Sequence, residues 1–155
     1  MKYDTLVFIG RFQPLHNAHL EIIKRCTALT EHLVIVVGSA HQPRTYKNPF
    51  TYDEREQMIR RAAGSLNIRI HVEPNIDTIY NDQAWAVRVQ NAVNKHRSPG
   101  AKVGIIGHKK DESSFYLDMF PQWDFVDVEQ IEPLGATDIR DLYFRRAFNS
   151  SFIKN

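Results

Sequence analysis

The 155-residue chain has very little cysteine and no long apolar segment. Cys26 is the single cysteine, which excludes an internal disulfide framework and a cysteine-based metal cluster and fits a reducing compartment. No apolar run approaches the roughly 20 residues of a membrane span. Residues 1–9 lack the basic start and long apolar core of a signal peptide. We therefore expect a soluble, cytoplasmic protein with no membrane partner.

An excess of charge of either sign is also absent. The chain has 20 basic and 18 acidic residues, a net charge of +2, which gives no case for general binding to nucleic acid. Internal repeats, low-complexity segments and domain linkers are missing from the sequence as well. Residues 1–155 are enough to bury a core, so we expect one domain whose partners are small molecules.

Short apolar runs alternate along the chain with helical patterns. The runs, mostly rich in valine and isoleucine, predict five parallel strands buried on both faces, at 5–10, 33–38, 68–73, 102–107 and 124–128. Helices are expected at about 17–31, 51–65, 82–97, 112–120 and 137–148. Thr51 and Glu54 have the spacing of a capping box at the second helix. This alternation predicts an α/β fold with a doubly wound parallel five-stranded sheet, which binds ligands at the carboxyl ends of its strands.

Residues 10–20 carry the strongest functional signal, with the sequence Gly-Arg-Phe-Gln-Pro-Leu-His-Asn-Ala-His-Leu directly after an apolar run. Gly10 lets a ligand approach the end of a strand, and the helix start that follows offers N–H groups and a positive dipole end to an anion. Arg11, His16 and His19 add side-chain donors at the same place. Together these features predict a polyphosphate site.

The two histidines are also compatible with packing or with metal binding. His19 lies on an apolar helical face with Ile22, Ile23 and Cys26, where a lone histidine is usually a core residue. His16 stands about one helical turn earlier on the same side, so both imidazoles can point into one cleft. A metal pair is a further alternative, but no third ligand follows at a recognised spacing. Phosphate is the better ligand, and we expect no metal held by the protein alone.

A second basic element lies at residues 135–140, with the sequence Gly-Ala-Thr-Asp-Ile-Arg. It follows the fifth predicted strand and opens the last predicted helix. The helix N-terminus, the Thr137 hydroxyl and Arg140 can therefore bind an anion at the same edge of the sheet as the first motif. Two such sites would hold both ends of a triphosphate. The alternative is that Thr137 only caps the helix and Arg140 is a surface charge.

These motifs resemble the nucleotidyltransferase superfamily with its His-x-Gly-His signature. Within it the chain is similar to nicotinamide mononucleotide (NMN) adenylyltransferases of the archaeal type, and most closely to the adenylyltransferase domain of bacterial bifunctional proteins that also carry a Nudix hydrolase domain. The similarity covers nearly the whole chain and includes residues 48–50, 54–55, 81–85, 107–114 and 120–123. Ala18 replaces the family's glycine. No Nudix-like sequence follows residue 155, so no pyrophosphohydrolase activity is expected.

The resemblance implies a Rossmann-like nucleotidyltransferase fold and a reaction in which ATP and NMN give NAD and pyrophosphate. The ionised phosphate of NMN attacks the α-phosphorus of ATP directly, so no general base is needed and catalysis comes from positioning and charge stabilisation. Mg²⁺ would be held by phosphate oxygens and water. By resemblance the catalytic residues are Arg11, His16, His19 and Arg140, and ATP is also bound by Gly10, Gly107, His108 and Thr137.

For the acceptor, the resemblance points to Trp85, Asp82, Asn81, Lys47 and Asn48. The Trp85 ring can stack on the cationic nicotinamide ring, while Asn81 and Asp82 can bind its amide or ribose. Lys47 and Asn48 stand in a long predicted loop and can reach the acceptor phosphate. Core packing is the alternative for the tryptophan, because it begins an apolar helical stripe with Val89, Ala92 and Val93.

Two other functions remain open. One is a related adenylyl- or cytidylyltransferase with another phosphate acceptor, and the other is a non-catalytic nucleotide-binding regulator. The intact residues Arg11, His16, His19 and Arg140 favour catalysis, and Trp85 favours NMN. The sequence does not distinguish nicotinamide from nicotinic acid mononucleotide. Related enzymes form dimers or hexamers, so a homo-oligomer is compatible with the resemblance, although periodicity shows no interface.

Overall fold

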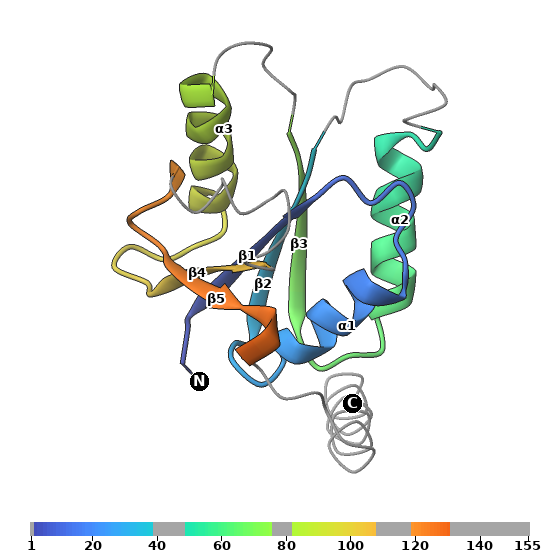
Figure 1. The fold of residues 1–155 in the computed structure, drawn as a ribbon, viewed down its shortest axis with the longest axis horizontal. Coiled ribbons are helices and arrows are strands. Elements are labelled where there is room, and N and C mark those ends of the chain that lie inside the picture. The colour runs from blue at the N-terminus through green and yellow to red at the C-terminus, as the bar shows by residue number, and fades with distance from the viewer. Residues whose placement is uncertain (1, 39–48, 76–81, 108–118, 131–155) are drawn as a thin grey trace, which may run out of the picture.

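The computed structural model describes residues 2–38, 49–75, 82–107 and 119–130, which form a parallel sheet with helices on both sides (Figure 1). The elements follow one another as β1 (Thr5–Gly10), α1 (Asn17–Cys26), β2 (His32–Val37), α2 (Tyr52–Ala63), β3 (Arg69–Pro74), α3 (Asp82–Asn94), β4 (Val103–Gly107) and β5 (Asp124–Asp127), with a 3-10 helix at Val128–Gln130. None of the described helices is long and apolar enough to cross a membrane.

The strand order is β3-β2-β1-β4-β5, and every neighbouring pair is parallel. β1 lies at the centre, where Phe8 is in register with Ile35 of β2 and Ile106 of β4. The chain moves outward from β1 to β3 and then returns to the other side of β1. This confirms the predicted doubly wound fold. It places the reversal of strand order between β1 and β4, the position at which open α/β sheets bind ligands.

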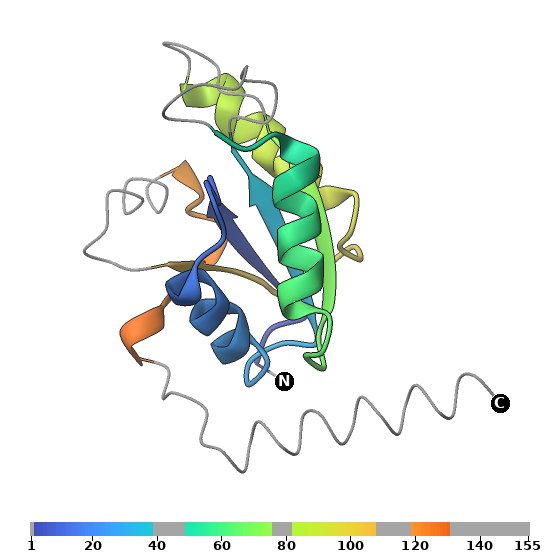
Figure 2. The same cartoon turned by 90° about the vertical axis from the view of Figure 1, so that its right-hand side faces the viewer.

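Helices cover both faces of the sheet. α1 and α2 lie on one face and α3 lies on the other (Figures 1 and 2). Alternate residues of the central strands belong to the two hydrophobic layers: Leu6 and Phe8 pack in the layer of α1 and α2, whereas Val7 and Ile9 pack in the layer of α3. Because both faces are covered, β1 and β2 are mostly apolar along their length, without alternation.

The predicted element boundaries differ little from those observed. All five strands agree with the expectation to within one residue at each end, and the capping box of α2 is present, with Thr51 Oγ1 accepting from Glu54 N–H at 3.2 Å. α1 ends at Cys26, five residues before the expected end. The Thr27 hydroxyl donates to the Lys24 carbonyl at 2.6 Å, which closes the helix. The expected helix at 137–148 lies outside the described residues, as does all but the end of 112–120.

Candidate active site

The segment that joins β1 to α1 brings two histidines face to face. His16 is the N-cap of α1 and His19 is its third helical residue, and their rings stack with centroids 3.6 Å apart. Ala18 N–H donates to His16 Nδ1, and His16 N–H donates to His19 Nδ1, each at 3.2 Å. The two imidazoles thus take the places of the Ser or Thr and the Glu in the common capping box.

This cap determines where the proton of each neutral ring lies. Because Nδ1 accepts a backbone N–H in both rings, a neutral imidazole here carries its proton on Nε2. Each ring then offers an Nε2–H donor to a ligand oxygen. Burial, and secondarily the nearby His16, lowers the pKa of His19 to about 4. His19 is therefore neutral at neutral pH, and its Nε2–H can donate a hydrogen bond without adding a charge.

Phe12 packs against the ring of His19. It is buried, with its centroid 4.7 Å from that of His19 and 5.4 Å from that of Phe8. Its φ of 53° is unusual for a residue other than glycine. A Cβ on Gly10 would lie 2.9 Å from the Phe12 ring. The missing side chain of Gly10 therefore makes room for Phe12. That it also lets a ligand approach the strand end stays a prediction.

Two polar side chains outside the predicted site hold this segment against α2. The Gln13 amide forms a pair with the backbone of Phe50, donating to its carbonyl at 3.0 Å and accepting from its N–H at 2.9 Å. The buried Arg55 donates from Nη1 to the carbonyls of Arg11 and Gly38, at 2.8 and 2.7 Å. In the sequence, the only indication of a role for Gln13 and Arg55 is that both lie in segments that resemble the nucleotidyltransferase family.

Three glycines lie at the edge of the sheet that the carboxyl ends of the strands form, namely Gly10, Gly38 and Gly107. Gly38 N–H donates to the Gly10 carbonyl at 2.9 Å, and Gly107 is the last residue of β4, the direct neighbour of β1. A Cβ on Gly38 or Gly107 would meet only ordinary contacts, at 3.8 and 3.9 Å. With the exposed Arg11, these backbone positions border the point where the strand order reverses.

The structure thus brings together five of the predicted site residues. Four lie on the β1–α1 segment and one ends β4: Gly10, Arg11, His16, His19 and Gly107. Asp82 begins α3, and its side chain is not among those described. Apart from Trp85, the other predicted site residues lie outside the described residues, namely Lys47, Asn48, Asn81, His108, Thr137 and Arg140.

Trp85 lies in the first turn of α3, at the border of the hydrophobic layer beneath that helix. Its partly buried ring packs against this layer, with its centroid 6.0 Å from that of Phe120. Val89 and Val93, further along the predicted stripe, are completely buried. Trp123 is buried too and stacks on Phe120, so it has a packing role. This packing buries the Trp85 side chain only in part.

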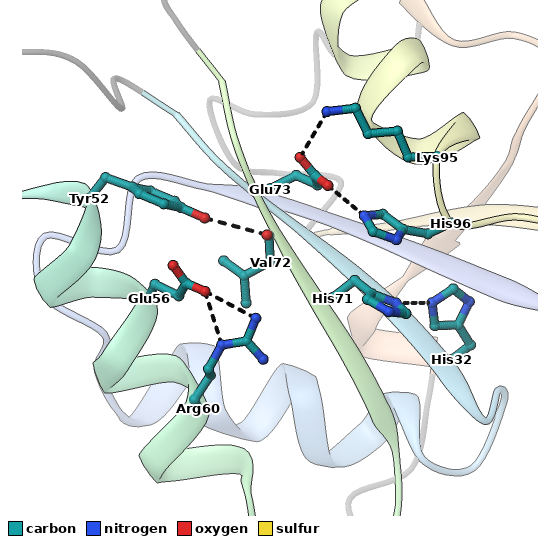
Figure 3. Close-up of polar contacts among 9 residues, drawn as sticks. All are labelled: His32, Tyr52, Glu56, Arg60, His71, Val72, Glu73, Lys95 and His96. Carbon is teal, nitrogen blue, oxygen red and sulfur yellow. Dashed lines mark hydrogen bonds and ion pairs between the residues drawn. The ribbon is translucent and has the colours of Figure 1, made fainter.

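The other described histidines form a separate cluster that joins β2, β3 and the segment after α3 (Figure 3). His32, the first residue of β2, has Nδ1 3.1 Å from the Thr5 hydroxyl and Nε2 2.7 Å from Nδ1 of His71 on β3. His71 stacks on His96, which pairs with Glu73. Burial lowers the pKa of His32 to about 4 and also lowers that of His71. Among the described residues, no group of three or more His, Cys, Asp and Glu is arranged to hold a metal ion.

Comparison with known proteins gives consistent matches. A family model described as cytidylyltransferase-like matches residues 7–141. The chain is 44% identical over 145 residues to a protein of Acinetobacter baylyi named nicotinamide/nicotinic acid mononucleotide adenylyltransferase, a match that covers 92% of this chain and 77% of that protein. Two crystal structures from Francisella tularensis, each described as a bifunctional NMN adenylyltransferase/ADP ribose pyrophosphatase, are also similar. Their TM-scores are 0.77 and 0.75, with 36% and 30% identity.

The second of these structures is a complex with AMP and a manganese ion. The matches cover 90% and 92% of this chain. In both cases the chain spans only 41% of the Francisella chain. The similarity is therefore to one part of those bifunctional proteins.

Proposed function

Since the chain belongs to the cytidylyltransferase-like family of nucleotidyltransferases, we propose that it is an NMN adenylyltransferase, which converts ATP and NMN to NAD and pyrophosphate. One observation of the structure carries the proposal. The stacked pair of His16 and His19 lies at the N-terminus of α1 with both Nε2 atoms left as donors, beside Arg11 and the reversal of strand order. This is a set of donors for a polyphosphate.

The proposed reaction needs charge stabilisation more than proton transfer. The ionised phosphate of the mononucleotide attacks the α-phosphorus of ATP, and the bond from that phosphorus to the pyrophosphate oxygen breaks. Negative charge shifts to phosphate oxygens as this happens. The Nε2–H groups of His16 and His19, whose rings the helix cap holds in place, stabilise that charge without reorganising, and the guanidinium of Arg11 adds a positive charge.

The motif similarity supports roles for the remaining predicted residues. Gly107 and His108 border the adenine, and Thr137 and Arg140 hold the β- and γ-phosphates. The acceptor residues follow from the same similarity and from the place of Trp85 in the first turn of α3. Trp85 stacks on the nicotinamide ring, and its neighbours in the acceptor site are Lys47, Asn48, Asn81 and Asp82.

A divalent cation belongs to this proposal as a partner of the substrate. The guanidinium and N–H groups at the β1–α1 segment are donors, so they fit phosphate oxygens and do not fit a cation. We assign Mg²⁺ to the phosphate oxygens of ATP and to water, where it would neutralise part of the triphosphate charge. A manganese ion accompanies AMP in one Francisella structure, which supports the use of a divalent metal.

The test is an assay with ATP, Mg²⁺ and one acceptor at a time. NMN, nicotinic acid mononucleotide, phosphopantetheine and a sugar phosphate are compared, and both the product and pyrophosphate are quantified. We expect equal amounts of NAD and pyrophosphate with NMN. Pyrophosphate formed only with phosphopantetheine or the sugar phosphate would favour a related transferase. Binding of ATP with no turnover on any acceptor would favour a nucleotide-binding regulator.

A further inference from the structure

Arg55 is buried as completely as the core leucines. It lies in the first turns of α2, and only 1% of the residue is exposed. Removing a guanidinium from water is costly unless its donors find partners inside the protein. The partners of Arg55 therefore show what this part of α2 holds in place.

Three backbone carbonyls accept hydrogen bonds from this side chain. Nη1 donates to Arg11 O at 2.8 Å and to Gly38 O at 2.7 Å, and Nε donates to Thr51 O at 3.2 Å. Arg11 directly follows β1 and Gly38 directly follows β2. Gly38 N–H in turn donates to Gly10 O at 2.9 Å. A single guanidinium thus connects the ends of two neighbouring strands to the start of a helix.

These contacts affect the candidate phosphate site although Arg55 does not belong to it. The hydrogen bond to the Arg11 carbonyl constrains the peptide from which the exposed Arg11 side chain extends. The same bonds compensate the partial negative charge of two carbonyl oxygens, those of Arg11 and Gly38, with a buried cation. Both effects favour the binding of a polyphosphate at the carboxyl ends of β1 and β2. Donors bind an anion best when their backbone is fixed and when no carbonyl oxygen nearby repels it.

We propose that Arg55 is a positioning residue, which holds the backbone of Arg11 and Gly38 so that Arg11 and the paired histidines meet the triphosphate. The inference rests on the proposed function, since it takes the triphosphate to bind at Arg11. Arg55 itself touches no substrate. The Gln13–Phe50 pair attaches the same segment independently, so loss of Arg55 loosens the segment without detaching it.

The experiment compares Arg55→Met, Arg55→Lys and a control, Ile59→Ala. Methionine keeps an apolar stem but has no donor. Lysine keeps a charged donor on a shorter side chain and is expected to restore part of the function. Ile59 is fully buried one turn further along the same helix, so its truncation reduces stability without touching either strand end. The melting temperature, the KM values for ATP and NMN, kcat, and ATP affinity by calorimetry are measured for each variant.

We expect Arg55→Met to lower kcat/KM for ATP about 10- to 100-fold, the scale of a small displacement of positioned groups, with the KM for NMN nearly unchanged. Arg55→Lys lies between this variant and the wild type. Ile59→Ala lowers the melting temperature and leaves the KM for ATP within about twofold of the wild type. If Arg55→Met does not fold, the comparison of Arg55→Lys with Ile59→Ala decides.

A folded Arg55→Met with wild-type ATP kinetics would overturn the inference, and so would wild-type ATP kinetics of Arg55→Lys if Arg55→Met does not fold. Equal kinetic losses in Ile59→Ala and the Arg55 variants would overturn it too, because they would reflect stability alone. Failure of the proposed function has a different signature, since the wild-type chain would then bind ATP without forming NAD. In that case calorimetry still tests the inference, which requires weaker ATP binding in Arg55→Met.

Discussion

At the scale of single residues, His16 and His19 cap α1 with one ring nitrogen and keep the other for the proposed ligand. Nδ1 of each ring accepts a backbone N–H and completes the cap of α1, while Nε2 remains as a donor. The cap therefore fixes the tautomer and the orientation of the ring before any substrate binds. In the proposed reaction a phosphate oxygen would meet donors that need no rearrangement, which is the condition for strong stabilisation of developing charge.

Replacing His19 by alanine is expected to lower turnover about 100- to 1000-fold, the usual loss when a preorganised donor to transition-state charge is removed. The variant also loses the acceptor for His16 N–H, at a cost of about 1 kcal/mol in stability. Thr27→Ala is the matched control, since it removes a cap at the other end of α1, away from the site. Steady-state kinetics and thermal unfolding of both variants are compared. Near-normal turnover of a folded His19→Ala protein would assign His19 to packing.

Trp85 is the residue at which function and packing compete most evenly. We expect Trp85→Phe to keep most activity. Trp85→Leu should need a few-fold to about 30-fold more NMN, because it loses a cation–π interaction of about 0.5–2 kcal/mol with the nicotinamide ring. ATP affinity and the melting temperature should change little. A lowered melting temperature with unchanged NMN affinity would remove Trp85 from the acceptor site.

At the scale of elements, the cluster of His32, His71 and His96 joins β2 and β3 to the end of α3 (Figure 3). Glu73 of β3 binds both His96 and the neighbouring Lys95. These groups contact one another across three elements, and the buried ring of His32 is enclosed between Thr5 and His71. Protonation of the cluster is therefore expected to change how firmly the end of α3 is attached to β2 and β3.

Acid is expected to weaken this attachment. Burial lowers the pKa of His32 to about 4, with the charge of Arg69 as the next cause, and burial also lowers the pKa of His71. The unfolded chain, with histidine pKa values of about 6.5, then binds more protons than the folded one. Stability is complete above about pH 6.5 and declines as the pH falls toward 4. Urea unfolding at about pH 7.5 and pH 5 should differ by about 1–3 kcal/mol.

His32→Gln is the variant that isolates this contribution. Glutamine does not titrate, so the difference between the two pH values should shrink in the variant even if its stability at neutral pH is reduced. His19 also has a lowered pKa and contributes to the remaining difference. An unchanged pH dependence in His32→Gln would place the acid sensitivity elsewhere in the chain.

At the scale of the whole molecule, the strand order places the candidate site at the carboxyl ends of the strands, where the order reverses. The order reverses between β1 and β4, so the β1–α1 segment and Gly107 come together although they lie far apart in the sequence. The helices α1 and α2 cover one face of the sheet and α3 covers the other, so the central strands are packed on both faces (Figures 1 and 2).

Removal of divalent metal is expected to separate activity from folding. Addition of EDTA should lower NAD formation at least about 100-fold, because the triphosphate loses the cation that neutralises its charge. The melting temperature of the ligand-free chain should not change, since the proposed cation is bound through ATP. Titration of Mg²⁺ or Mn²⁺ should restore activity. A lower melting temperature in EDTA alone would point instead to a metal held by the protein.

The elements and the first motif were predictable because they depend on short-range patterns. Short apolar runs define the strands, and the Thr51–Glu54 capping box defines the start of α2. The spacing of His16 and His19 by three residues is sufficient to bring their rings to one side of a helix, and the structure shows them stacked. The sequence by itself therefore determined the fold class, the positions of the strands and the location of the candidate site.

Only the tertiary structure decided what lies beneath that site. The contact between Arg55 and the Arg11 carbonyl spans 44 residues, and no periodicity distinguishes this buried arginine from an exposed one. The ring of Phe12 occupies the space that a side chain on Gly10 would need. Phe12 has a positive φ, which its residue type does not predict. His32 and His71 meet because β2 and β3 are neighbours in the sheet. Such contacts depend on which distant segments pack together, and local sequence patterns do not contain that information.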